Sequence, residues 1–465
     1  MQKRNFILLI IVLIIIIGII FGIFYFFKPA SPTGEDTTGT NFFSQFNPFG
    51  TSKPTPPVVT PPTDISGYQP PAPEEKIKLK KVSSVPIAGF TVFSKERLKE
   101  IPVAPITEQN TTTSGGTPGG GAPGSPVGTQ TTGTKTTTTK NTKPVAPLTE
   151  FMPALRYVDR ITGNIYQTFA DKIEERKFTT MLIPKVYEAF FGKNGESIIM
   201  RYLKEDGRTI QTFVGNLPKE ILGADTTENN LIKGSFLPEN ITDLSLSADK
   251  GSIFYLFTVG ESMLGTILDL TTNKKTQVFD SAFTEWSSFW PNNKIITLTT
   301  KPSAQVSGYV YKIDLTGGKN LTKIMGNING LTTQTSPDGK AILYTDNSLV
   351  LNVYHTDTNT SESLGVQTMP EKCVWNKTSD FIYCAVPKTI DFGSYPDTWY
   401  QGEVSFSDQI WKIEAKTGKG NILVDPIAVK GGEDIDGIKL GLEDGENYLF
   451  FVNKKDSFLW ELELK

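Results

Sequence analysis

Short apolar runs with an alternating pattern fill the C-terminal two-thirds of the chain. The clearest run follows the turn sequence Ser336-Pro337-Asp338-Gly339-Lys340. Pro fixes φ at the first corner of a turn, Asp accepts a hydrogen bond from backbone two residues on, and Gly adopts positive φ. The pattern predicts a tight β-hairpin whose second strand contains Ile342 and Tyr344.

Turns of this kind recur ahead of apolar strands. Six of them lie at residues 192–195, 247–251, 290–293, 336–339, 376–379 and 443–445. Their central positions are 40 to 66 residues apart. A four-stranded unit of about 40 residues, lengthened by insertions, is typical of a propeller blade.

The turn at 336–340, with Ile342 and Tyr344, resembles the WD-like repeat of TolB-type periplasmic proteins and of prolyl-oligopeptidase-type propellers. The resemblance covers about residues 77–465 and implies an all-β propeller. It transfers no catalytic residue to this chain.

The ends of this region predict the number of blades. The last blade supplies three strands, near 438–442, 448–452 and 458–464, and residues 77–82 offer the missing fourth strand. Closing the ring with both ends of the region removes the exposed edges of an open sheet. We therefore predict seven blades, with six blades starting near Leu148 as the alternative.

An uninterrupted apolar run of 22 residues begins at Phe6 and ends at Phe27. It is long enough to cross a bilayer as a helix. Lys3 and Arg4 precede it and Lys28 follows, so the positive-inside bias predicts a cytoplasmic N-terminus and an extracytoplasmic propeller. A cleaved signal peptide is the alternative, but no small-residue cleavage site follows the run, and we favour an uncleaved anchor in the cell membrane.

Two segments have compositions that do not favour a packed core. Residues 29–76 are rich in Pro and Thr and predict a disordered stalk, and an insertion at about 94–153 is rich in Thr, Gly and Pro. The rest of the composition is balanced, with a net charge of −3. That balance gives no support for binding to nucleic acid.

Propeller topology assigns these segments to faces. Loops between first and second strands share one face with loops between third and fourth strands. We expect the stalk and the insertion there. Residues 217–240 and 387–407 are expected to join fourth to first and second to third strands, which places them together on the opposite face. Function concentrates in loops held by a rigid scaffold, so that opposite face is the predicted binding surface.

Cys373 and Cys384 flank a predicted hairpin turn. Pairing Asn376 with Phe381 places the two cysteines directly opposite each other, at a distance that suits a disulfide. An oxidising exterior would allow the bond, whereas two free buried thiols are the alternative.

The loop after Pro387 mixes aromatic and acidic residues. Asp391, Tyr395, Asp397, Trp399 and Tyr400 suit contact with a protein or a glycan. A loop packed over its blade by its own aromatic residues is the alternative.

Motifs for metal binding, phosphate binding and serine hydrolysis are missing from the sequence. We therefore predict no catalytic, cofactor or metal residue, and a non-catalytic binding or scaffold module that contacts another envelope protein. The alternative is a propeller enzyme or glycan-binding protein with its site at the mouth of the central channel. A small-molecule or glycan ligand stays open.

Overall fold

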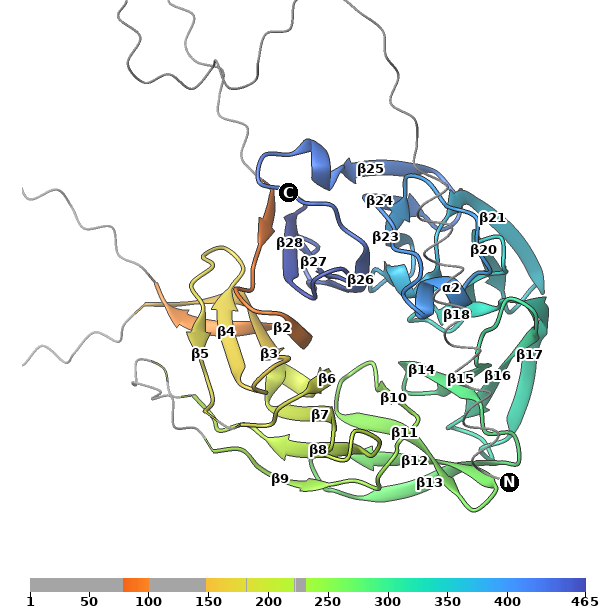
Figure 1. The fold of residues 1–465 in the computed structure, drawn as a ribbon, viewed down its shortest axis with the longest axis horizontal. Helices are drawn as coiled ribbons and strands as arrows, with labels where there is room; N and C mark the ends of the chain where they lie inside the picture. The colour runs from red at the N-terminus through yellow and green to blue at the C-terminus, as the bar shows by residue number, and fades with distance from the viewer. Residues whose placement is uncertain (1–77, 100–147, 181, 221, 223–230) are drawn as a thin grey trace, which may run out of the picture. The chain divides into compact units, whose positions relative to one another are not determined.

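The computed structural model describes residues 78–99, 148–180, 182–220, 222 and 231–465. These residues form seven four-stranded antiparallel sheets arranged in a ring (Figure 1). The fold is an all-β seven-bladed propeller, which confirms the predicted fold and excludes six blades.

Each of the first four blades runs outward from the centre in chain order. Their strands are, in blade one, β2 (Ile87–Leu98), β3 (Thr149–Asp159), β4 (Ile165–Phe169) and β5 (Arg176–Lys177); in blade two, β6 (Val186–Phe191), β7 (Ser197–Leu203), β8 (Ile210–Asn216) and β9 (Lys233–Phe236); in blade three, β10 (Asp243–Leu246), β11 (Ser252–Val259), β12 (Ser262–Asp269) and β13 (Lys275–Ser281); in blade four, β14 (Trp286–Asn292), β15 (Ile295–Thr300), β16 (Ser307–Asp314) and β17 (Leu321–Asn329).

The remaining blades follow the same order, except that the last one takes a strand from the beginning of the propeller. Their strands are, in blade five, β18 (Thr332–Thr335), β19 (Ala341–Thr345), β20 (Val350–His355) and β21 (Thr360–Gln367); in blade six, β22 (Cys373–Trp375), β23 (Phe381–Pro387), β24 (Asp408–Glu414) and β25 (Gly420–Val424); in blade seven, β26 (Gly437–Leu442), β27 (Tyr448–Asn453), β28 (Leu459–Glu463) and β1 (Leu79–Lys81).

Helical structure is confined to short segments between strands. The described residues contain α2 (Asp397–Tyr400) and the 3-10 turns η2 (Lys193–Gly195), η3 (Pro370–Lys372) and η4 (Pro426–Ala428).

The ring closes by pairing β1 with β28. Leu79 pairs with Leu462 and Lys81 pairs with Trp460, and the orange β1 lies beside the blue β28 in Figure 1. Leu79, Trp460 and Leu462 are buried in the apolar core of blades six and seven. The prediction that residues from 77–82 complete the last blade is confirmed.

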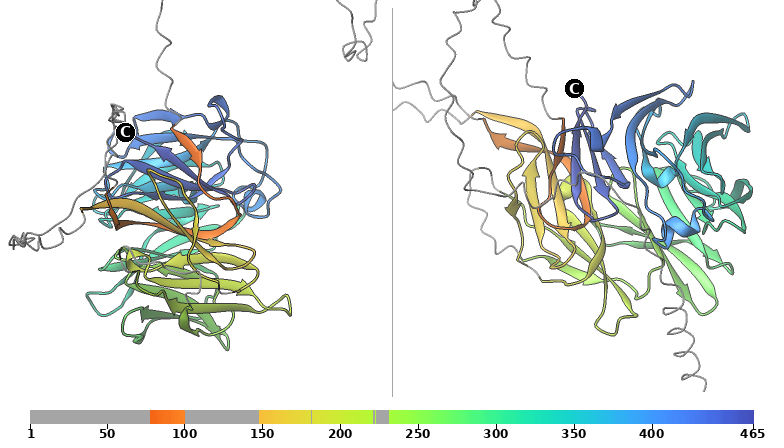
Figure 2. Two further views of the ribbon diagram at one scale, coloured as in Figure 1. Left: turned by 90° about the vertical axis from the view of Figure 1, so that its left-hand side faces the viewer. Right: turned by 45° about the horizontal axis from the view of Figure 1, so that its top comes forward.

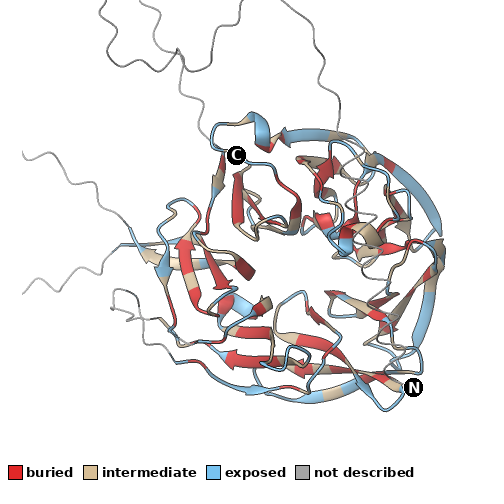
Figure 3. Cartoon of the chain, in the orientation of Figure 1, coloured by how far each residue is buried: buried red, intermediate tan, exposed pale blue. Residues whose placement is uncertain are grey.

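Burial explains the apolar runs that follow each turn. The second strand of a blade packs against both neighbouring blades, so β27 is buried along nearly its whole length. The outermost strands face solvent and are drawn mostly pale blue in Figure 3, and all four residues of β9 are exposed. Apolar runs therefore identify middle strands better than outer ones.

The turn from which the repeat was recognised has the expected geometry. Ser336 donates from Oγ to Asp338 Oδ1 at 2.5 Å, and Lys340 N donates to the same oxygen at 3.0 Å. Gly339 has a φ of 77°. Ala341 N closes the turn on Ser336 Oγ at 2.9 Å, so the side chains that suggested a turn also build it.

Blade one differs from the prediction in two places. Strands β2 and β3 stay paired as far as Leu98 and Thr149, so both strands extend into the insertion expected at 94–153. They form a two-stranded ribbon whose ends project from the ring (Figures 1 and 2). The apolar residues from Phe178 to Ile183 predict a fourth strand at 178–183, whereas the structure forms the two-residue β5 in its place. Two residues are too few to leave a periodic signal in the sequence.

The loop at 217–232 also corrects the prediction. It joins β8 to β9, the third and fourth strands of blade two, and does not lead to the first strand of the next blade. The described ends of this segment, at the end of β8 and the start of β9, therefore lie on the face where β2 and β3 project. The error arose because β9 has the sequence Lys-Gly-Ser-Phe, which shows no alternation of apolar and polar residues.

The predicted membrane span and stalk lie outside the described residues. Within the described ranges, none of the helices has the length and apolar character needed to cross a membrane.

Candidate functional site

A cleft of about 1030 Å³ lies between blades one and two. One wall is the ribbon of β2 and β3, and the other is the loop segment that contains Pro218 and Glu220. Side chains alternate along a strand, so Lys95 on β2 and Arg156 on β3 point to the same face of the ribbon. The strand pairing of blade one thus directs two cations into the cleft.

Glu220 is the acceptor for three cations, and we call Glu220, Lys95, Arg156 and Arg176 the Glu220 cluster. Arg156 Nη2 lies 2.9 Å from Glu220 Oε2, which also pairs with Lys95 Nζ. Arg176 Nη2, from β5, pairs with Oε1. Three positive charges therefore converge on one carboxylate.

Arg156 is fixed by further contacts. Its Nε donates to Gln167 Oε1 at 2.9 Å and its Nη1 donates to the carbonyl of Gly195 at 2.6 Å. Its guanidinium lies 4.3 Å from the ring centre of Phe178. A Cβ at residue 195 would approach the Arg156 side chain to 3.3 Å, and Gly195 has a φ of 65°. Glycine at the turn of blade two therefore leaves room for the arginine.

Partial burial shifts the pKa values of the Glu220 cluster. Loss of solvent lowers the pKa of Lys95 and of Arg156, and the negative charge of Glu220 opposes both shifts. Loss of solvent alone would raise the pKa of Glu220, but the hydrogen bond and charge of Lys95, with Arg156 and Arg176, together lower it. The three cations together therefore favour the ionised form of the Glu220 carboxylate.

The rest of the cleft is close to neutral. Around the Glu220 cluster lie Arg97, Lys172 and Lys219, and the carboxylates Glu96, Glu174, Glu175 and Glu196. Arg97 is paired with Glu150 at 2.8 Å and with Asp171, and Lys172 is paired with Glu174 at 3.2 Å. The excess of positive charge is thus local to the inner end, around Glu220.

A second buried cluster lies between blades six and seven, on the opposite face. We call Lys372, Asp408 and Asp436 the Lys372 cluster. Lys372 Nζ lies 2.7 Å from Asp408 Oδ2 and 2.5 Å from Asp436 Oδ1, and all three side chains have 0% exposure. Burial raises the pKa of Asp408 to about 6, against the opposing charge of Lys372. Water does not reach these charges, so the cluster offers no site to a ligand.

The Lys372 cluster forms hydrogen bonds with the loop at 388–407, which was predicted to bind a partner. Asp436 Oδ2 accepts hydrogen bonds from Trp399 Nε1 at 3.0 Å and from Phe406 N at 3.1 Å. Tyr395 and Trp399 are each 4% exposed and pack against Phe406 and Leu349. These two aromatic residues are therefore not the exposed contacts that were proposed, and the loop packs over its blade as in the alternative.

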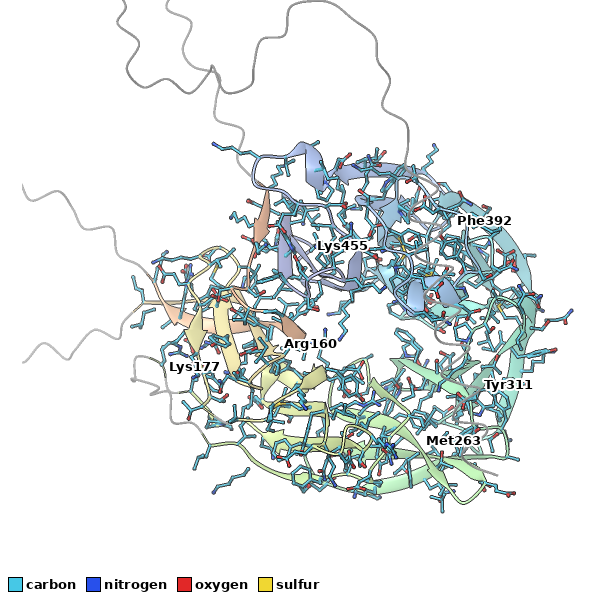
Figure 4. The ribbon with its side chains drawn as sticks, in the orientation of Figure 1. Arg160, Lys177, Met263, Tyr311, Phe392 and Lys455 are labelled. Atoms are coloured by element: carbon cyan, nitrogen blue, oxygen red, sulfur yellow. A yellow bond between two sulfur atoms is a disulfide. The ribbon has the colours of Figure 1, made fainter. Side chains whose placement is uncertain are left out.

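The other predicted loop residues also have internal partners. Asp397 accepts a hydrogen bond from Ala304 N at 2.9 Å, Tyr400 donates to Glu371, and the carbonyl of Asp391 accepts from the Tyr395 hydroxyl at 2.7 Å. Phe392, in contrast, is fully exposed and lies far from Lys177 of blade one across the ring (Figure 4).

Cys373 and Cys384 are bonded in a disulfide and lie directly opposite each other on β22 and β23, with Cα atoms 4.1 Å apart. The bond joins the first two strands of blade six. Cys373 directly follows Lys372 in the chain.

The inner strands of the adjacent blades two and three carry acidic residues, and β2 carries Glu96 near its projecting end. Glu188 on β6 pairs with Arg201 at 2.5 Å, and Asp243 on β10 accepts hydrogen bonds from Ser288 N and Oγ. The inner strands β14, β18 and β22 contain no carboxylate. Within the described ranges, no group of three or more His, Cys, Asp or Glu side chains is placed to hold a metal ion.

The Glu220 cluster was not predicted from the sequence. The only local signal is the charged alternation Lys95-Glu96-Arg97 at the end of an apolar strand. Nothing near Glu220 indicates that it meets residues 44, 64 and 125 positions earlier in the chain.

Comparison with known proteins identifies no family. No protein-family model and no curated protein matches the chain. Similar solved structures include an oligogalacturonate lyase in complex with manganese, with 11% identity over 67% of this chain and 85% of that chain, at a TM-score of 0.43.

Two further propellers show the same level of similarity. The oligogalacturonate lyase of Vibrio parahaemolyticus has 8% identity, covers 68% of this chain and 86% of its own, and has a TM-score of 0.43. TolB from Acinetobacter baumannii has 12% identity, covers 67% and 76%, and has a TM-score of 0.38. The propeller fold that the TolB-type resemblance implied is shown by the strand arrangement itself, and the function must be argued from the site.

Proposed function

We propose that this chain is a non-catalytic binding module, presented outside the cell membrane by an N-terminal anchor, and that it binds another envelope protein through the cleft between blades one and two. The observation that carries the proposal is the Glu220 cluster, where three cations meet one carboxylate beside solvent. Arg176 is 45% exposed at its side chain and Glu220 is 11% exposed, so a partner can reach both. In the loop at 388–407, Tyr395 and Trp399 are buried, whereas Phe392 and Tyr400 are exposed.

The membrane part of the proposal rests on sequence and on the disulfide. The apolar run from Phe6 to Phe27, with Lys3 and Arg4 before it, favours a single-pass anchor with a cytoplasmic N-terminus. A disulfide between Cys373 and Cys384 is compatible with an oxidising compartment.

Photo-crosslinking from the full chain in native membranes tests the binding surface. A photoreactive amino acid replaces Lys219 or Leu222, which line the cleft, or Phe392 on the loop of the opposite face. We expect the same protein adduct from both cleft positions and none from Phe392. An adduct from Phe392 alone, or no adduct at any position, contradicts the proposal.

Labelling of intact cells tests the orientation. The variant Phe392→Cys should react with a membrane-impermeant maleimide, whereas Gln2→Cys should react only after the membrane is permeabilised. Equal labelling of both, or labelling of Gln2→Cys alone, contradicts an extracytoplasmic propeller.

A site at the mouth of the central channel is the second candidate function. Its support is Asp243, whose pKa is raised by burial. The negative charge of Glu188, on the neighbouring inner strand, adds to this shift. Under this alternative, a divalent cation or a soluble peptidoglycan fragment raises the Tm of the native chain, and Glu188→Gln or Asp243→Asn abolishes the shift. The leading proposal expects no such shift.

A further inference from the structure

We infer that the Lys372 cluster is a site of covalent self-modification, at which Lys372 Nζ forms an amide bond with the side-chain carbon Cγ of Asp408 and Asp436 acts as the general base. The inference goes beyond the proposed function and does not depend on the partner that the cleft binds. In the structure the three side chains are in contact, as they would be before the reaction.

The reacting atoms already lie close together. Lys372 Nζ is 2.7 Å from Asp408 Oδ2, and Cγ is bonded directly to that oxygen. Reacting atoms in a near-attack geometry lie about 3–3.5 Å apart, and such placement can correspond to an effective concentration of about 10⁵–10⁸ M. Lys372 ends η3 and Asp408 begins β24, so the packing of blade six fixes both groups.

The two carboxyl groups differ in their hydrogen bonds, and the difference assigns their roles. Asp436 Oδ2 accepts hydrogen bonds from Ser405 Oγ and Phe406 N, both at 3.1 Å. Such bonds favour the charged form of a carboxyl group, so Asp436 suits the role of proton acceptor. Asp408 Oδ1 is buried and has no hydrogen-bond partner among the described residues. Burial raises the pKa of Asp408 to about 6, which keeps part of this group as the neutral acid that an amine can attack.

Each bond change has a group beside it. Asp436 Oδ1, 2.5 Å from Nζ, takes a proton from the ammonium group and leaves a neutral amine. The electron pair of the amine attacks Cγ of the neutral Asp408 side chain. The negative charge that develops on Oδ2 is stabilised by Gly437 N, which donates a hydrogen bond to this oxygen at 2.6 Å.

The remaining steps release one water molecule. Asp436 passes its proton to Asp408 Oδ1, the bond from Cγ to Oδ1 breaks, and the oxygen leaves as water. Asp436 then accepts the extra proton from the nitrogen, and the Cγ–Oδ2 double bond forms again. One amine and one carboxylic acid give one amide and one water, so the reaction needs no oxidant, reductant or further reactant.

The surroundings exclude solvent, which favours the amide over its hydrolysis. Lys372, Asp408 and Asp436 all have side chains with 0% exposure. The aromatic rings of Trp399 and Phe406 each lie 5.4 Å from Lys372 Nζ. A closed site of this kind strengthens the interactions among its fixed groups and keeps water from the product.

The amide extends the covalent links within blade six. The disulfide between Cys373 and Cys384 joins β22 to β23. A bond between Lys372 and Asp408 adds a link from the residue before β22 to the first residue of β24, 36 positions later in the chain. The loop at 388–407 then lies inside a closed covalent ring that reduction of the disulfide does not open.

Mass spectrometry of the purified full chain tests the inference. After reduction of the disulfide, most chains should be lighter than the sequence by the mass of one water molecule. A tryptic digest should contain a branched peptide that joins Lys372 to Asp408, which distinguishes the amide from any other loss of water. An absence of this peptide would overturn the inference, and a bond from Lys372 to Asp436 would overturn the assigned roles.

The same digest contains a matched control. Lys388 and Asp425 lie 2.6 Å apart, but their side chains are 29% and 26% exposed. Water reaches this pair, so its members should remain in separate peptides. A bond between Lys388 and Asp425 at the same yield would show that contact alone suffices and would contradict the role given to the buried site.

Two variants test the roles of the side chains. Lys372→Arg keeps the positive charge but cannot form the amide, so its mass should equal that of its sequence. Asp436→Asn keeps the size of the side chain and removes the proton acceptor, so the linked fraction after the same time should fall about tenfold. Asp425→Asn should leave the linked fraction unchanged. An unchanged linked fraction in Asp436→Asn would refute the general base, and the peptide map of the native chain decides the inference even where a variant does not fold.

Discussion

The Glu220 cluster and the Lys372 cluster contain the same kinds of ions in opposite proportions. The first surrounds one carboxylate with three cations beside solvent, and the second surrounds one ammonium group with two carboxylates at 0% exposure. A buried ion depends entirely on its partners, whereas an ion near water can exchange them. The comparison indicates that the Lys372 cluster stabilises the fold, whereas the Glu220 cluster lies where we propose that a partner binds.

Removing the cation of the Lys372 cluster is expected to have the largest effect. Lys372→Met leaves Asp408 and Asp436 buried without a counter-ion, and the loss of stability should be about 3–5 kcal/mol, as for other broken buried pairs. Urea unfolding of the native chain and of the Lys372→Met chain measures the difference in their free energies of unfolding.

The matched control for that substitution is Lys388→Met. Lys388 pairs with Asp425 at 2.6 Å, but both side chains are more than a quarter exposed. Its loss should cost less than about 1 kcal/mol. Similar losses for the two variants would show that the Lys372 cluster does not fasten the loop.

Glu461 sharpens the comparison, because it is a buried carboxyl group that has no hydrogen-bond partner among the described residues and has only the charge of Lys80, on the paired strand, to oppose its pKa shift. It is fully buried on β28, neither oxygen has a hydrogen bond, and burial raises its pKa to about 8 from an ordinary 4.5. The unfolded chain therefore releases this proton at lower pH than the folded chain. The stability that protonated Glu461 contributes is fully present below pH 4.5 and is lost as the pH rises through about 8.

The expected slope is up to about 1.4 kcal/mol per pH unit within that window. Unfolding at a series of pH values should show a flatter profile for Glu461→Gln. Glu463→Gln, on the same strand, removes a charge that helps to raise the pKa of Glu461 and should flatten the profile less than Glu461→Gln does. A native profile in Glu461→Gln would mean that Glu461 has partners in solution.

The disulfide beside Lys372 should contribute a smaller amount. Closing an 11-residue separation removes chain entropy from the unfolded state, worth about 3 kcal/mol in the entropic model. Cys373→Ala with Cys384→Ala should lower the Tm, and reduction of the native chain by dithiothreitol should reproduce the drop. A reductant effect on the double variant would contradict this explanation.

Glu220→Gln should have a smaller effect on stability than Lys372→Met or loss of the disulfide. Arg156 keeps its bonds to Gln167 and Gly195, and water can solvate Arg176, so the loss should be about 1 kcal/mol. Added salt should reduce the difference by screening the remaining cations. A loss as large as that of Lys372→Met would assign the Glu220 cluster a structural role and remove the contrast between the clusters.

Local sequence patterns were sufficient to predict the blades and the direct opposition of Cys373 and Cys384. The turn at 336–339 contains the residues that form its hydrogen bonds, and an apolar middle strand follows each such turn. The partner for β28 could be predicted because a three-stranded last blade requires one more strand. The short β5 and the exposed β9 escaped prediction, since neither has enough buried side chains to show a period.

The sequence by itself determined the seven-bladed ring, its closure by β1 and the direct opposition of Cys373 and Cys384. These features follow from turns and alternation within about ten residues of each strand. Only the tertiary structure brought Glu220 to Lys95, Arg156 and Arg176, and buried Trp399 over the Lys372 cluster. Charged and aromatic residues look alike in a sequence whether they face water or a neighbouring blade, and the packing of the blades decides which they meet.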